Sequence, residues 1–177
     1  MTNRPGNGSL NFMRTVISLC LFGLTACDSG IDSSEGPQFA IYRLRDAKLF
    51  ASQLWDEPLE NLVLADTPLV ALEDVTSYRW QTHEFKVTAA ADSQLAAIST
   101  TLGPVGGIPF VVTVGNERIY LGAFWYPHSS LVPQVPYIDV MLDPHRICQR
   151  WGGQGGEDKR NDPRIYLALK NARVLIE

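Results

Sequence analysis

The sequence predicts one domain of the α+β class, with a largely antiparallel sheet of about five strands and two main helices. The clearest signal is a hairpin, in which the β-rich runs PFVVTV and RIYLGAFW flank the turn Gly115-Asn116-Glu117. A second signal is the run AAADSQLAAIST, whose apolar residues recur at helical spacing. Strands joined by turns, with few helices between them, favour an antiparallel sheet that carries its helices on one face.

The elements before the hairpin follow from local patterns. A strand is expected from Phe39, where the run FAIYR has apolar residues on both faces. Asp46 is a suitable N-cap for a short helix over 46–55. Alternating apolar and polar residues predict a strand over 83–88, and Thr88 can cap the helix AAADSQLAAIST that follows it.

The elements after the hairpin are a strand, a loop and a helix. The strand is expected over 137–142, after a proline-rich loop, and the run WGGQGGEDKRNDP is predicted to be a long surface loop. Asp162 supplies a cap and Pro163 a fixed φ angle, which together start a helix. The residues expected to face the core from this helix are Ile165, Leu169 and Ala172.

A targeting segment precedes the predicted domain. From Met13 the chain reads MRTVISLCLFGLTACDSG, which places one arginine before an apolar run that ends in small residues and a cysteine. The run is too short to cross a bilayer, which needs roughly 20 apolar residues. It has the length and flanks of a secretory signal core. Residues 1–26 are therefore predicted to be a removable signal peptide, with Met13 a candidate for the true start.

The residues Leu24-Thr25-Ala26-Cys27 resemble the lipobox of bacterial lipoproteins. The resemblance implies that the Cys27 thiol accepts a diacylglyceryl group, that a peptidase cuts before it, and that the new amino terminus is acylated. Two or three acyl chains anchor a protein stably, so we expect membrane attachment on the extracytoplasmic side. In enteric bacteria, an aspartate at the place of Asp28 implies retention at the inner membrane. An ordinary secretory signal with a chance cysteine is the alternative.

The rest of the chain divides into a tether over 27–38, which is polar and rich in glycine and serine, and a single globular domain over 39–177. The net charge of −4 and the lack of a basic patch exclude a nucleic-acid-binding face. The run GGQGGEDKR lacks the ending of a phosphate-binding loop, and no cofactor is predicted. Cys148 is the one cysteine left after processing and lipidation, and a buried, inert thiol is favoured.

The region from TPLVALEDV to GIPFVVTVGNERIYLGAF resembles the first periplasmic domain of the SecD translocase subunit. Both have a strand, a helix after it and then a hairpin. The resemblance implies an architecture and not translocation, because the region has no catalytic signature and SecD's membrane-spanning helices have no counterpart here.

Three residues suggest a hydrolase. His128 and Ser129 follow an aromatic run, and His145 is a candidate base with Asp139 or Asp143 as the orienting acid. No GxSxG or SxxK motif accompanies them, so a polar loop is the favoured interpretation.

A metal site is the next hypothesis. Asp139, Asp143 and His145 have side chains suited to zinc or manganese, but their spacing matches no known site type. Capping of a loop by Asp143 before Pro144 is the favoured interpretation. His83 lies near aromatic residues on a strand pattern, and it is expected to form a structural hydrogen bond.

Aromatic residues concentrate in and after the hairpin. If a face of the hairpin is uncovered, they form a surface for a peptide, glycan or protein partner; if it is covered, they are core, which is favoured. The residues concerned are Tyr120, Phe124, Trp125, Tyr126 and Tyr137.

These observations lead to a functional hypothesis. The chain is expected to be a membrane-anchored lipoprotein of the cell envelope, whose non-enzymatic domain binds or scaffolds another envelope component. Addition of a partner strand to a sheet edge is one mode of such binding. The alternative is a small envelope hydrolase that uses His128, Ser129 and His145.

Overall fold

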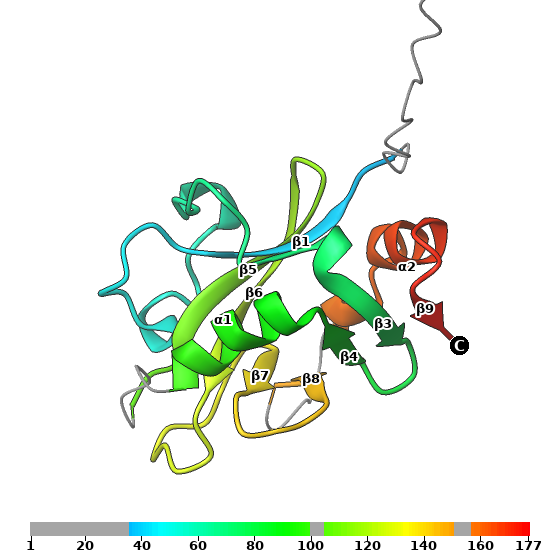
Figure 1. Cartoon of the computed structure of the whole chain (residues 1–177). Coiled ribbons are helices and arrows are strands. Elements are labelled where there is room, and N and C mark those ends of the chain that lie inside the picture. Colours follow the sequence, from blue (N-terminus) through cyan, green and yellow to red (C-terminus); the bar gives the residue numbers. More distant parts are fainter. Residues whose placement is uncertain (1–35, 100–104, 151–156) are drawn as a thin grey trace, which may run out of the picture. The chain divides into compact units, whose positions relative to one another are not determined.

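The computed structural model describes residues 36–99, 105–150 and 157–177 (Figure 1). The predicted leader, Cys27 and most of the predicted tether lie outside the described residues, as does part of the predicted loop after residue 150. No helix among the described residues is long and apolar enough to span a bilayer.

The described part of the chain holds one nine-stranded sheet, with the order β2-β1-β5-β6-β7-β8-β4-β3-β9. The strands are β1 (Phe39–Arg43), β2 (Val70–Ala71), β3 (Val75–Arg79), β4 (Glu84–Val87), β5 (Ile108–Val114), β6 (Glu117–Trp125), β7 (Tyr137–Asp139), β8 (His145–Cys148) and β9 (Leu175–Ile176). The helices are α1 (Ala89–Ser99) and α2 (Pro163–Asn171), with short 3-10 turns η1 (Ala51–Gln53), η2 (Leu59–Asn61), η3 (Leu72–Asp74) and η4 (Lys159–Asn161).

The prediction of a largely antiparallel sheet of about five strands is wrong. The sheet is mixed, because β6 pairs with β7 in parallel and β3 pairs with β9 in parallel. The additional strands are short, and β2 and β9 have two residues each. Strands of that length carry too few residues to show an alternating pattern, so the sequence gives no sign of them.

Local predictions fared better than the count of strands. The hairpin is confirmed as β5–β6, and Asp162 caps α2 by accepting a hydrogen bond from the Arg164 backbone N–H at 2.9 Å. The helix expected over 46–55 is wrong, since this segment forms only the 3-10 turn η1. The strand expected over 137–142 is too long, because β7 ends at Asp139 and a turn follows it.

The sheet curls, so that strands far apart in its order meet across the core. The ring of Phe39 in β1 lies edge-on to that of Tyr78 in β3, with centroids 6.3 Å apart, although five strands separate β1 from β3 in the sheet. Both α-helices contribute to this cluster, α1 through Leu95 and α2 through Leu169.

The opposite face of β5 and β6 is covered as well. A second cluster joins Leu121 and Trp125 of β6 to Leu54 and Leu62, from the segment that contains η1 and η2. The central hairpin is therefore buried on both faces, which places its residues among the least exposed of the described chain.

Candidate functional site

The sheet is interrupted along one side of β6. On the side away from β5, β7 pairs only with Ala123–Trp125, and no strand of the described chain pairs there with the first half of β6. A β-bulge falls in that half, because Ile119 and Tyr120 both face the same core cluster. Bulges of this kind bend a strand and end its pairing, and they are common next to binding sites.

A cleft of about 420 Å³ lies at this interruption. Ile119–Leu121 of β6 form one wall, and residues between Trp55 and Leu59 form the second. Gln134–Pro136, Gln149–Arg150 and Glu157–Lys159 close the remaining sides. These segments are far apart in the sequence, and the fold brings them together around the unpaired part of β6.

The Trp55 wall carries an unsatisfied hydrogen-bond donor. The indole Nε1 of Trp55 is buried and has no hydrogen-bond partner within the described residues. A buried N–H without an acceptor costs about 1 to 3 kcal/mol.

The wall formed by Glu157–Lys159 is stiffened by a paired charge. The carboxylate of Asp158 forms an ion pair with Arg160 at 2.6 Å, and a second Arg160 nitrogen donates to the backbone carbonyl of Ile147 at 2.8 Å. The hydrogen bonds from Arg160 hold the pKa of Asp158 below its usual range. This carboxylate is therefore ionised at neutral pH and paired with Arg160. It is a structural group and not a free base.

Behind Asp158 and Arg160 lies a buried pair of polar rings. The Tyr78 hydroxyl and His83 Nδ1 are 3.1 Å apart. Burial lowers the pKa of His83 to about 4 and raises the pKa of the Tyr78 hydroxyl. His83 is neutral at neutral pH and makes the structural hydrogen bond expected from the sequence.

The structure does not bring the three candidate hydrolase residues into a relay. His128 is exposed, with its ring packed against Tyr126 at 5.3 Å, and Ser129 Oγ accepts the Leu131 backbone N–H at 3.1 Å. His145 Nε2 lies 2.9 Å from Asp92 Oδ1 of α1. Among the hydrogen bonds of the described residues, none joins His128, Ser129 and His145 to one another.

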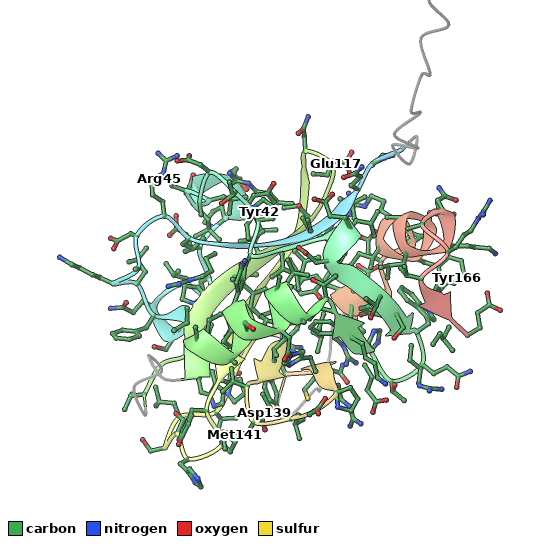
Figure 2. The ribbon with its side chains drawn as sticks, in the orientation of Figure 1. Tyr42, Arg45, Glu117, Asp139, Met141 and Tyr166 are labelled. Carbon is green, nitrogen blue, oxygen red and sulfur yellow. The ribbon has the colours of Figure 1, made fainter. Side chains whose placement is uncertain are left out.

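The candidate metal ligands are also engaged separately. Asp139 Oδ1 accepts the backbone N–H of Met141 at 2.9 Å, and these two residues lie at the end of the sheet away from Glu117 (Figure 2). Asp143 is exposed and precedes Pro144, whereas His145 contacts Asp92. No group of three His, Cys, Asp or Glu residues in the described ranges is arranged to hold a metal ion.

An exposed aromatic surface on the hairpin is contradicted by the burial of its members. Tyr120, Phe124 and Trp125 are at most 5% exposed, because both faces of β6 are covered. Phe124 packs against Phe110 with centroids 4.9 Å apart. Tyr126, which follows β6, is half-buried.

The remaining aromatic candidate, Tyr137, is half-buried in β7, where it lies opposite Cys148 of β8. Burial raises the pKa of the Cys148 thiol, so this cysteine is less reactive than a free thiol.

The cleft retains one predicted binding residue, Tyr120, which is buried and belongs to the β6 wall. Trp55, Asp158 and Arg160 were not anticipated. Their signal is weak, because Trp55 stands in a polar turn and the other two stand within a charged run that predicts a solvated loop.

Comparison with known protein families, with curated proteins and with solved structures finds no match for this chain.

Proposed function

We propose that this protein is a lipid-anchored module of the bacterial envelope that binds a ligand without chemical conversion, in the cleft beside β6. The domain is held at the extracytoplasmic membrane surface through Cys27, and the cleft receives another envelope component. The lipobox-like residues Leu24-Thr25-Ala26-Cys27 and the apolar run before them support the anchor.

One observation carries the assignment of the cleft. The first half of β6 has no strand beside it within the described chain, yet this stretch lies between walls that enclose about 420 Å³. A concave site with apolar walls and a few polar groups is the usual form of a binding site.

The contacts of the candidate catalytic residues support binding over hydrolysis. Ser129 Oγ is occupied by a turn N–H, and His145 is held by Asp92. A nucleophilic serine needs a base within about 3 Å and an acid that orients the base.

Site-specific photocrosslinking in living cells tests this function. A photoreactive amino acid at Gln134, an exposed residue of the cleft, is expected to give a discrete crosslinked product. The same amino acid at Lys86, exposed on β4, is the control and is expected to give none. Equal products at the two positions, or none at Gln134, would contradict the assignment.

A further inference from the structure

We infer that the ligand of this cleft is an extended peptide that pairs with β6 as an added strand. The inference rests on the proposed function, since it names the class of ligand for the same site. The argument concerns the backbone of β6, whose unpaired stretch ends where β7 begins.

The hydrogen bonds that Ala123 and Trp125 make on the β7 side show which way the backbone N–H and C=O groups of Leu121 point. Ala123 N–H donates to the Pro136 carbonyl at 3.0 Å, and the Trp125 carbonyl accepts the Val140 N–H at 3.4 Å. Because peptide groups alternate along a strand, the N–H and C=O of Leu121 point to the same side as those of Ala123 and Trp125. They therefore face the cleft.

Leu121 lacks the backbone partner that Ala123 and Trp125 have on the β7 side of β6. Within the described chain, no backbone or side-chain hydrogen bond reaches its N–H or C=O on the side away from β5. Backbone groups in such a position are normally paired, and an added strand pairs both of them at once.

The size of the cleft fits a short stretch of strand. A strand residue fills about 160 Å³, taking a rise of about 3.3 Å, a strand spacing of about 4.8 Å and a sheet spacing of about 10 Å. The cleft of about 420 Å³ thus accommodates about three residues. This matches the length of Ile119–Leu121, which forms the β6 wall.

The two faces of the added strand would meet different surroundings. Leu121 and Val135 belong to the second apolar cluster, and Trp55 packs against it. The wall formed by Glu157–Lys159 is charged instead. Successive side chains of a strand point to opposite faces, so the preferred peptide alternates an apolar residue with polar ones.

Selection of peptides against the full-length protein in detergent micelles tests the inference. A displayed library of random heptapeptides is expected to yield binders with alternating apolar and polar residues. In a chosen binder, each backbone nitrogen is then methylated in turn. Methylation at the nitrogen that bonds Leu121 is expected to weaken binding about tenfold, whereas methylation of its two neighbours is expected to have little effect.

The outcomes separate the two proposals. Failure to select any peptide, or binding that no single N-methylation weakens, overturns strand addition. If photocrosslinking at Gln134 succeeds in that case, the cleft remains a binding site for another class of ligand. If neither peptide selection nor crosslinking succeeds, the proposed function fails with the inference.

Discussion

Arg160 holds Asp158 with two parallel hydrogen bonds, from Nε to Oδ1 at 2.9 Å and from one terminal nitrogen to Oδ2 at 2.6 Å. Its other terminal nitrogen bonds the Ile147 carbonyl of β8. This guanidinium therefore ties η4, which follows the cleft wall, to the sheet. The geometry is the bidentate form that gives arginine–carboxylate pairs their strength.

Removal of this carboxylate is expected to destabilise the fold. The two side chains are 12% and 20% exposed, so Asp158→Ala leaves a largely buried guanidinium without its partner. We expect a loss of about 2 kcal/mol in the free energy of unfolding, measured by urea denaturation. Asp66→Ala is the control, because Asp66 pairs with Arg45 on the surface and exposed pairs contribute about 0.5 kcal/mol. Equal losses in the two variants would contradict this role for Asp158.

The stability of the fold is expected to fall in mild acid because of His83. Its pKa is about 4 in the folded protein and near 6.5 in an unfolded chain, so only the unfolded state gains a proton between these values. The contribution of His83 is intact above pH 6.5 and is lost as the pH falls through 4. At pH 4.5 this loss amounts to about 2 to 3 kcal/mol.

Urea denaturation of His83→Asn at pH 7 and pH 4.5 checks this prediction. Asparagine tolerates the positive φ of 54° at this position. The variant is expected to lose less stability on acidification than the wild type, whereas His128→Asn, at an exposed histidine, is expected to behave like the wild type. An unchanged acid response of His83→Asn would contradict the assignment.

Gly122 is required by the close approach of Phe110. A Cβ atom built at Gly122 would lie 2.3 Å from Cζ of Phe110, and this ring is fully buried. Gly122→Ala is therefore expected to destabilise the protein by about 1 to 3 kcal/mol, measured by thermal or urea unfolding. In the background Phe110→Leu the added cost of Gly122→Ala should nearly vanish. An equal cost in both backgrounds would show that the ring is not the cause.

Lipidation at Cys27 is testable independently of the cleft. Cells grown with a labelled fatty acid are expected to label the wild-type protein and Cys148→Ser. Cys27→Ser is expected to carry no label, because its side chain lacks the thiol that accepts the diacylglyceryl group. A label that persists in Cys27→Ser, or disappears in Cys148→Ser, would contradict the anchor.

The sequence predicts those parts of the fold that depend on neighbouring residues. The hairpin turn and the Asp162 cap lie within a few residues of the groups they organise, so their patterns are readable. The parallel pairing of β6 with β7 depends instead on the path of the intervening loop. The burial of Phe124 and Trp125 depends on two clusters formed by segments distant in the sequence.

The cleft shows the same limit. Its walls come from segments that are separated by many residues. No local sequence pattern therefore links Trp55 to Leu121. A bulge at Ile119 interrupts the β5–β6 ladder, and Ile119 and Tyr120 both pack in the same core cluster. The local sequence indicates a regular strand there.

Amide hydrogen exchange of the ligand-free protein tests most directly whether β6 offers an open edge. The alternation of the strand points the Gly122 and Phe124 N–H groups toward β5, and their exchange is expected to be slow. The Leu121 N–H faces the cleft, and its exchange is expected to be much faster than theirs. If the Leu121 amide is as protected as that of Gly122, then the edge is already paired and the account is contradicted.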